Sequence, residues 1–300
     1  MKVSVVVPVK DNEEMIGDCI ESLLNQDFPK TDYEVIVVDN NSRDNTAKEI
    51  KRYPVKYLFE ERIGASFALN KGVNESSGPI IAFTDSDCIA DNKWLGELVK
   101  VFNEKNVASV AGEVIGFTPT ATVVEQFLAS YNNLSQGKNF DENGDPKGGY
   151  FPVYVVTANV AYKKNILVKL GMFDTQMRSG HDVDLSWRVQ WAGYKIAFSP
   201  EALIYHRYRR GVFGMFKKFF GYSYHRSLYL KKHRKELNKR IFFARYRYNS
   251  LLKNMVLMIP FLILKRGKEE KLKLVFQNIV DIAEITGSIF GSLKNRVVVL

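Results

Sequence analysis

Short runs of β-branched residues alternate with helical patterns through the first half of this 300-residue chain. The runs lie at Val3–Val7, Glu34–Val38, Val55–Phe59, Pro79–Phe83 and Val107–Ala111. Between them, apolar residues recur at helical spacing, most clearly over Glu13–Gln26. Strands that are apolar throughout need cover on both faces, and intervening helices supply it. The pattern therefore predicts an α/β fold, with a mostly parallel sheet sandwiched by helices.

The alternation stops near His206, where an aromatic and basic sequence begins. Residues 1–206 carry 21 Lys and Arg against 28 Asp and Glu, a net charge of −7. Residues 207–253 carry 15 against 1, a net charge of +14. Apolar residues from Val212 to Phe220 recur at helical spacing between lysines. We expect an α/β domain over 1–206 and a helical, basic region over 207–300.

The basic region fits two partners, an anionic membrane surface or nucleic acid. It holds 12 Phe and Tyr between Arg207 and Tyr248, and basic amphipathic helices with aromatic residues bind membrane interfaces. No known nucleic-acid-binding module is recognisable in the sequence, and an acidic first domain would repel phosphate. We therefore expect peripheral membrane association and no nucleic acid. The apolar run Met255–Leu264 would span only about 15 Å as a helix, so it either dips into the bilayer or is a buried helix.

The two cysteines, Cys19 and Cys88, are too few for a disulfide framework. A reducing compartment is the simpler expectation. The N-terminal apolar stretch is short, contains Pro8 and lacks a small-residue cleavage site, so it predicts a strand rather than a signal peptide. We expect a cytoplasmic protein at the cytoplasmic face of the cell membrane.

Polar residues with carboxylates follow three of the predicted strands. These segments are Pro8–Asn12, Asp39–Asp44 and Thr84–Cys88. In an open parallel sheet the carboxyl ends of the strands meet at one edge, and ligands bind there. The three segments therefore predict a single site.

Asp85-Ser86-Asp87 is the sharpest signal among these segments. Residues two apart in an extended chain point the same way. The two carboxylates either hold a divalent cation together, Mg²⁺ or Mn²⁺, or one holds the ion and the other a ribose. An exposed turn is the alternative interpretation, but the position after an apolar strand favours a functional role.

Asp39 ends another buried strand, where it would either bind a base or ribose or cap the next helix. The sequence has no glycine-rich phosphate-binding fingerprint. Binding of a diphosphate would therefore depend on the metal and on basic side chains. Arg62 and Lys71 are the candidate side chains for this contact.

The segment Gly180–Asp184 predicts the start of a helix. Asp182 is placed to act as a general base, although a carboxylate in a first turn also stabilises the helix dipole. His181 is a weaker candidate, and Asp184 can simply pair with Arg188 at i+4. His206 follows a strand-like stretch and is a candidate third metal ligand.

Six segments together resemble the family 2 glycosyltransferases, which have the nucleotide-sugar-binding GT-A fold. They occur in the order typical of that family over roughly residues 1–206: VSVVVPVKDN at Val3–Asn12, VIVVDNNSRDNT at Val35–Thr46, TDSDCIADNKWL at Thr84–Leu95, TANVAY at Thr157–Tyr162, GMFD at Gly171–Asp174 and HDVDLSWR at His181–Arg188.

The resemblance implies inverting transfer of a sugar from a UDP- or GDP-sugar, and the carboxylates of Asp85 and Asp87 make Mg²⁺ or Mn²⁺ the expected cofactor. It implies that Asp85 and Ser86 contact the ribose and phosphates, that Asp87 binds the metal, that His206 lies near it and that Asp182 is the catalytic base. It also implies that Pro8, Val9, Lys10, Asn12 and Asp39 lie against the nucleoside.

Three positions depart from the family pattern. His181 stands where the family usually has a Glu, and Lys10-Asp11 stands where Tyr-Asn is common. The stretch Ala68–Gly72 lacks the Arg that is common in the family, and Arg62 or Lys71 would supply the missing positive charge. Because a lipid phosphate is already ionised and needs no base, Asp182 favours a hydroxyl acceptor, such as a sugar on a glycan or glycolipid. A polyprenyl-phosphate glycosyltransferase and a non-enzymatic protein that binds membrane or nucleic acid are the alternatives.

Overall fold

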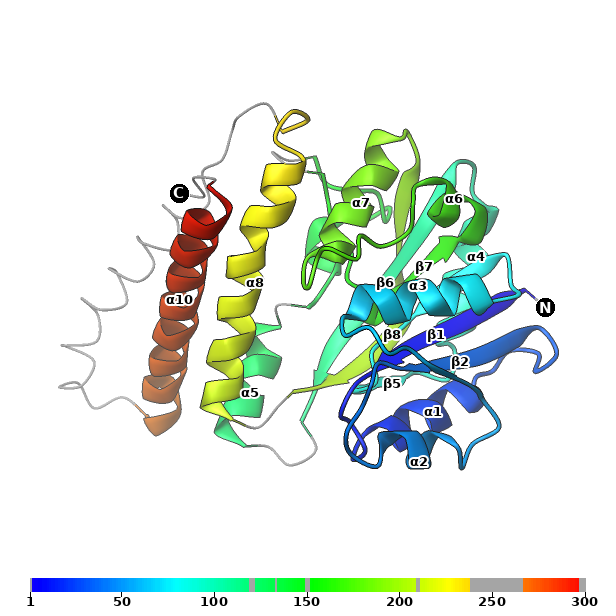
Figure 1. Ribbon diagram of the computed structural model, residues 1–300, viewed down its shortest axis with the longest axis horizontal. Helices are drawn as coiled ribbons and strands as arrows, with labels where there is room; N and C mark the ends of the chain where they lie inside the picture. Colours follow the sequence, from blue (N-terminus) through cyan, green and yellow to red (C-terminus); the bar gives the residue numbers. More distant parts are fainter. Residues whose placement is uncertain are drawn as a thin grey trace. The chain divides into compact units, whose positions relative to one another are not determined.

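The computed structural model describes residues 2–118, 122–132, 134–148, 152–208, 211–237 and 267–296. The chain divides into two compact units (Figure 1). The first combines Met1–Phe117 with Asn132–Arg207, and the second combines Thr118–Tyr131 with Tyr208–Leu300. Thr118–Tyr131 falls within the domain expected over 1–206, but it belongs to the second unit.

The first unit alternates strands and helices as the sequence pattern predicts. Its strands are β1 (Val3–Val9), β2 (Tyr33–Asp39), β3 (Lys56–Phe59), β4 (Ile80–Phe83), β5 (Cys88–Ala90), β6 (Val107–Phe117), β7 (Val160–Lys163) and β8 (Lys195–Arg207). Its α-helices are α1 (Ile16–Leu24), α2 (Thr46–Ile50), α3 (Ala65–Glu75), α4 (Trp94–Lys100), α6 (Lys164–Lys169) and α7 (His181–Trp191). Short 3₁₀ helices lie at Val101–Asn103, Gly137–Asn139 and Thr157–Asn159.

All of these strands form one eight-stranded mixed sheet in the order β3-β2-β1-β4-β7-β6-β8-β5. The pairs β1–β2, β1–β4, β2–β3 and β6–β8 are parallel, while β4–β7, β6–β7 and β5–β8 are antiparallel. Two reversals around β7 leave β6 and β8 running in the direction of β1. The carboxyl ends of β1, β2, β4 and β8 therefore meet at one edge, together with the first residue of β5.

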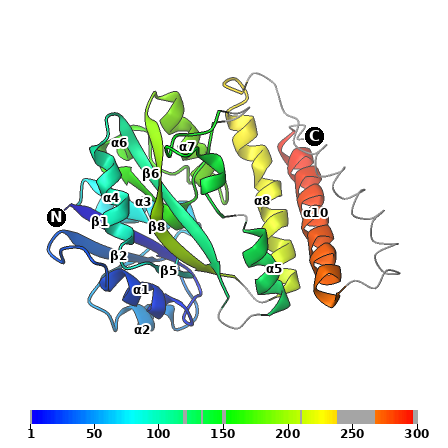
Figure 2. The same cartoon turned by 180° about the vertical axis from the view of Figure 1, so that it is seen from behind.

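Helices cover both faces of the sheet (Figures 1 and 2). On one face, apolar side chains of α3, α6 and α7 pack on β1, β2 and β4 in a cluster that includes Val6, Leu69, Phe83 and Leu185. The helix α3 approaches β1 closely at Gly72, where a Cβ atom would come within 3.0 Å of the Val6 side chain.

Residues 153–162 form an apolar, strand-like stretch of sequence, but only its last residues belong to a strand. Residues 157–159 form a 3₁₀ turn, and β7 begins only at Val160. The cause is Asn159, whose fully buried amide donates to the carbonyls of Glu113 and Ala202 and accepts from the Trp94 indole. An amide with three buried partners fixes the backbone in a turn here.

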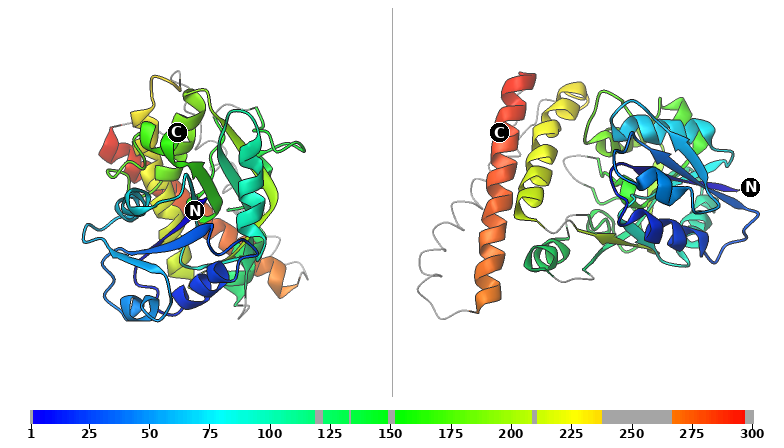
Figure 3. Two further views of the ribbon diagram at one scale, coloured as in Figure 1. Left: turned by 90° about the vertical axis from the view of Figure 1, so that its right-hand side faces the viewer. Right: turned by 60° about the horizontal axis from the view of Figure 1, so that its bottom comes forward.

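The second unit consists of α5 (Val123–Tyr131), α8 (Val212–Lys232) and α10 (Lys268–Asn295), of which α8 and α10 lie side by side (Figure 3). The predicted helical spacing from Val212 is confirmed by α8. Two α10 glycines, Gly287 and Gly291, let the helices approach closely, because a Cβ at either position would come within 3.0 Å of an α8 carbonyl oxygen.

Aromatic rings connect α5 to the other two helices of its unit. Phe127 contacts Phe276 and Tyr131 contacts Phe219, with ring centroids 5.4 and 5.6 Å apart. Within the described residues, no helix combines the length and apolar character needed to cross a bilayer. The run Met255–Leu264 lies outside the described residues.

Candidate active site

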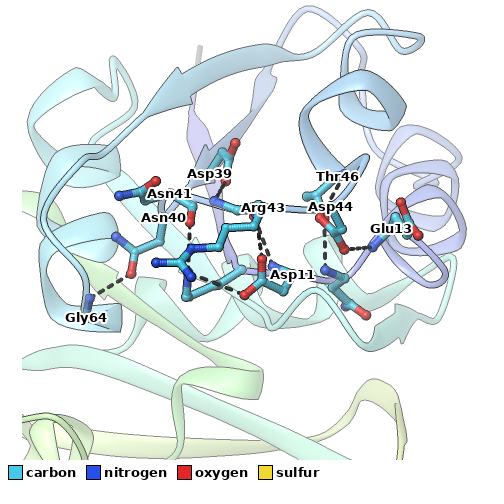
Figure 4. A network of polar contacts seen from close by, with 12 residues as sticks. Asp11, Glu13, Asp39, Asn40, Asn41, Arg43, Asp44, Thr46 and Gly64 are labelled. Atoms are coloured by element: carbon cyan, nitrogen blue, oxygen red, sulfur yellow. Dashed lines mark hydrogen bonds and ion pairs between the residues drawn. The ribbon is translucent and has the colours of Figure 1, made fainter.

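The loops after β1 and β2 form one polar network (Figure 4). The Lys10 ammonium donates to the carbonyl of Asn41 at 2.8 Å, and the Arg43 amide donates to the Asp11 carboxylate at 2.7 Å. Asp11 and Asn41 have φ angles of 48° and 61°, in the left-handed region that Asp and Asn tolerate best among residues with a Cβ. The network holds Lys10 and Asn12 at the edge where the parallel strands end.

Asp39, the last residue of β2, is almost fully buried, with 2% of its surface exposed. One carboxylate oxygen accepts from the Ser42 amide at 2.9 Å, and the other accepts from the Tyr57 hydroxyl at 3.1 Å. Burial and the neighbouring Asp39 charge raise the pKa of Tyr57 to about 12, so this hydroxyl remains a donor. The carboxylate is thus held in one orientation, with lone pairs left to accept from a ligand.

A hydrogen bond joins the loop after β1 to the loop after β4. The Asn12 amide donates to the Ser86 hydroxyl at 2.8 Å. The turn after β4 is closed by a bond from the Cys88 amide to the Asp85 carbonyl at 3.1 Å. The structure therefore brings two of the three predicted ligand-binding segments into direct contact, and the network around Asp11 adds the third.

Asp87, Cys88 and His206 form a candidate metal centre. The first residue of β5, Cys88, lies opposite His206 of β8, and Nε2 of His206 is 3.5 Å from Oδ1 of Asp87. One ligand atom from each residue lies within 4.8 Å of the other two. A carboxylate and an imidazole at this distance suit a divalent cation such as Mn²⁺, so the residues present fit the cofactor that the sequence implies.

The two predicted phosphate-binding cations already have partners in the structure. Arg62 forms a two-point ion pair with the buried Glu60, at 2.8 and 3.0 Å, and its guanidinium stacks on the Phe67 ring. The ammonium of Lys71 donates to the carbonyl of Phe59. Each cation is therefore held near the end of β3, and reaching a ligand would require a rearrangement.

Asp182 lies in the first turn of α7, which begins after Gly180 in the left-handed conformation (φ 80°). Three residues separate the end of α7 from the start of β8. The Val183 amide donates to Oδ1 of Asp182 at 2.9 Å. Asp182 is thus suited to accept a proton at its other oxygen.

His181 is buried beside Asp182, and neither ring nitrogen has a hydrogen-bond partner among the described residues. Its ring stacks edge-on against Phe173 at 5.6 Å, and Phe173 in turn contacts Phe83 of β4 at 5.3 Å. Burial lowers the pKa of His181, and the nearby charge of Asp182 raises this pKa by a smaller amount. These rings connect the start of α7 to the end of β4, which directly precedes Asp85.

Asp184 has a structural role, as its spacing to Arg188 suggested. Its fully buried carboxylate accepts from Arg188 at 2.6 and 2.8 Å. The guanidinium also donates to the carbonyls of Leu170 and Met172. This cluster anchors the loop before Asp182 to α7.

Three neighbours of the site were not singled out from the sequence. Tyr57 has no motif of its own, and Phe173 lies in the GMFD segment but was given no role there. Only tertiary register brings these residues beside Asp39 and His181. Cys88 adjoins Asp87, but its cross-strand position opposite His206 cannot be read from spacing.

Comparison with known proteins supplies a family. A model described as glycosyl transferase family 2 matches residues 4–169, which include Asp39 and Asp87 but end before Asp182. Glycosyltransferase AglE of Haloferax volcanii is 29% identical over 210 residues, which cover 68% of this chain and 66% of AglE. This chain therefore spans just under two thirds of that relative.

Two further proteins are similar over more of their length. One is a dolichyl N-acetyl-alpha-D-glucosaminyl phosphate 3-beta-D-2,3-diacetamido-2,3-dideoxy-beta-D-glucuronosyltransferase of Methanococcus voltae, 25% identical over 77% of this chain and 74% of its own. The other is a solved structure, mannosyltransferase PcManGT from Pyrobaculum calidifontis in complex with GDP-Man and Mn²⁺. It superposes with a TM-score of 0.60 at 18% identity, covering 97% of this chain and 73% of that one. The likeness confirms the fold expected from the sequence.

Proposed function

Because the chain belongs to glycosyl transferase family 2, we propose that it transfers a sugar from a UDP- or GDP-sugar to a hydroxyl group of a glycan or lipid-linked glycan. The observation that carries the proposal is the pairing of Asp87 with His206 at 3.5 Å, next to the Ser86 hydroxyl that Asn12 holds. Segments more than a hundred residues apart in the sequence thus meet at the edge where ligands bind such sheets.

The donor would lie along the ends of β1, β2 and β4. In this proposal Asp39 accepts hydrogen bonds from the nucleoside, with Pro8, Val9, Lys10 and Asn12 beside it, and Asp85 and Ser86 contact the ribose and phosphates. Asp87 and His206 would hold Mn²⁺ or Mg²⁺, which when bound offsets the negative charge of the diphosphate. Arg62 and Lys71 would add positive charge only after leaving Glu60 and the Phe59 carbonyl.

Asp182 would be the general base. One of its oxygens is oriented by the Val183 amide, and the other takes the proton of the acceptor hydroxyl. The acceptor oxygen then bonds to the anomeric carbon as the bond from that carbon to the diphosphate oxygen breaks. The nucleoside diphosphate leaves with the electron pair, and the configuration inverts.

The decisive experiment compares D182N with D27N, which changes an exposed carboxylate before β2. We expect D182N to lose a factor of about 10²–10⁴ in turnover, the typical contribution of a general base. Binding of the nucleotide sugar should stay within about twofold of wild type, because Asp182 contacts the acceptor. Full turnover in D182N would contradict the base assignment and favour a polyprenyl-phosphate acceptor.

The donor is identified by a nucleotide-release screen. Purified protein is incubated with UDP- and GDP-sugars in the presence of Mn²⁺ or Mg²⁺, and release of the nucleoside diphosphate is measured. Slow hydrolysis of one donor without acceptor is the expected result. The same screen with D87N and H206A should show loss of metal-dependent release, since both residues are assigned to the metal.

We further propose that the second unit binds the cytoplasmic face of an anionic membrane, close to a lipid-linked acceptor. Support comes from its exposed apolar side chains, including Phe213 at 79%, Phe290 at 59% and Leu293 at 72% exposure. Basic residues accompany them on α8, such as Lys217 and Lys231, and each is worth about 1 kcal/mol near an anionic surface.

Flotation with vesicles of phosphatidylglycerol and phosphatidylcholine tests the membrane proposal. Wild-type protein should float at low salt and float less at high salt, because salt screens the electrostatic part of the attraction. The F213S variant should float less than wild type, whereas V168S, which alters an exposed apolar residue on α6 of the first unit, should not differ. Absence of flotation at either salt concentration would defeat the proposal.

A further inference from the structure

The thiol of Cys88 gives the candidate metal centre an unusual third donor. β5 pairs antiparallel with β8, and Cys88 lies directly opposite His206. Residues directly opposite each other in antiparallel strands project from the same face, with Cβ atoms about 4.5–5.5 Å apart. Asp87, which precedes Cys88, is tied to the same strand because its carbonyl accepts from the Arg207 amide at 2.9 Å. Register therefore brings the three side chains together.

The distances suit a small tetrahedral ion. Sγ of Cys88 is 3.9 Å from Oδ1 of Asp87, which is 3.5 Å from Nε2 of His206. Bonds of about 2.0–2.3 Å in a tetrahedral zinc site separate ligand atoms by roughly 3.3–3.6 Å. The separation of Sγ and Oδ1 needs to shorten by only a few tenths of an ångström to reach that geometry. The third separation, between Sγ and the His206 nitrogen, is at most 4.8 Å and would shorten by up to about 1.5 Å.

Burial leaves one open side to this centre. Cys88 and His206 are 1% and 4% exposed, whereas a quarter of the Asp87 side chain is exposed. An ion could therefore enter past Asp87 and retain water or a phosphate oxygen as a fourth ligand, as zinc sites with three protein ligands do.

The donor set discriminates between metals. Mg²⁺ and Mn²⁺ prefer oxygen ligands and gain little from a thiol, whereas Zn²⁺ binds sulfur, nitrogen and oxygen together. We propose that Cys88 is a ligand for thiophilic ions, so that Zn²⁺ binds Asp87, Cys88 and His206 more tightly than Mg²⁺ or Mn²⁺ does and displaces them. The thiol releases its proton to solvent on binding. The inference rests on the metal site of the proposed function but does not require transfer activity.

Cobalt is the spectroscopic probe, because Co²⁺ replaces Zn²⁺ and a thiolate ligand gives a sulfur-to-cobalt charge-transfer band in the near ultraviolet. Titrating the full chain with Co²⁺ alone should produce this band, with one ion bound per chain. C88S should lack the band. C19S should keep it, since Cys19 is the other buried thiol and its Sγ faces the Asp85 carbonyl instead. A band that persists in C88S would overturn the proposal.

Affinities measured by calorimetry provide a second readout. We expect C88S and C88A to weaken Zn²⁺ binding at least about tenfold, since loss of even an outer-shell partner of a metal ligand costs about 10–100-fold in affinity. The same variants should change Mn²⁺ binding by less than about threefold, because Mn²⁺ prefers oxygen ligands. Thermal melts check that both variants fold. Equal loss of Zn²⁺ and Mn²⁺ affinity would contradict the proposal that Cys88 favours Zn²⁺ over Mn²⁺.

The two proposals fail separately because binding is measured without donor or acceptor. An inactive protein with a Cys88-dependent cobalt band supports this inference and contradicts the proposed transfer. An active enzyme with no such band overturns this inference and leaves the proposed transfer standing.

Discussion

Protonation of His181 should destabilise the fold below neutral pH. Its imidazole is buried against Phe173, and neither nitrogen has a hydrogen-bond partner among the residues that the structure describes. Burial favours the neutral ring and lowers the pKa, and the charges of Asp182 and Asp184 oppose this only in part. In the unfolded chain the same group titrates near 6.5.

The sign and size of the effect follow from linkage. Between the folded-state pKa of His181 and 6.5, the unfolded chain binds a proton that the folded protein does not. The stabilisation is complete above pH 6.5 and is lost as the pH falls toward the lower, folded-state pKa. Each pH unit within this window costs up to about 1.4 kcal/mol in the free energy of unfolding.

Urea unfolding followed by tryptophan fluorescence measures this slope, from about pH 7.5 to about pH 5.5. Trp187 lies on the same helix as His181 and is buried. We expect H181F and H181Q, which differ in size and polarity but both lack the titrating group, to lose the same part of the pH dependence. If wild type and both variants show parallel pH profiles, the assignment of this slope to His181 is wrong.

Two further substitutions test the packing that positions the site. G72A should destabilise the first unit by about 1–2 kcal/mol, since its Cβ would clash with Val6 and overpacking outweighs the gain in helix propensity. On α4, G96A meets only a ring carbon at 3.9 Å and should be neutral or stabilising in the same urea titration. D184N should cost about 3–5 kcal/mol, measured by thermal or urea unfolding, because it leaves the largely buried Arg188 without its charge partner. A loss below about 1 kcal/mol would contradict that role for the ion pair.

Local pattern was sufficient to predict the sheet and the position of its polar edge. The β-branched runs of β1 and β2 are buried on both faces, so they show the continuous apolar character of central strands. The polar segment that begins at Asp85 follows such a strand, and for that reason its place at the edge could be predicted. α7 starts at His181, inside the segment Gly180–Asp184 where the start of a helix is predicted.

Long-range register could not be predicted in the same way. The contact of Asp87 with His206 depends on β5 pairing antiparallel with β8, and no local pattern specifies which strands pair. The short β7 is a second case, because the turn at Asn159 depends on carbonyls from β6 and β8. Likewise, the ion pair that occupies Arg62 involves Glu60, a buried carboxylate that the sequence does not distinguish from a surface one.

The glycine contacts between α8 and α10 restrict how the second unit can deform. Gly287 and Gly291 lie four residues apart, each against an α8 carbonyl. A slide of one helical turn, about 5.4 Å, would carry Ala283 or Asn295 into a space that admits no side chain. The two helices therefore resist sliding along their axes and should move together as one rigid body. A displacement of the exposed end of α10 near Leu293 would then move α8 as well, and the contacts at Gly287 and Gly291 would be kept.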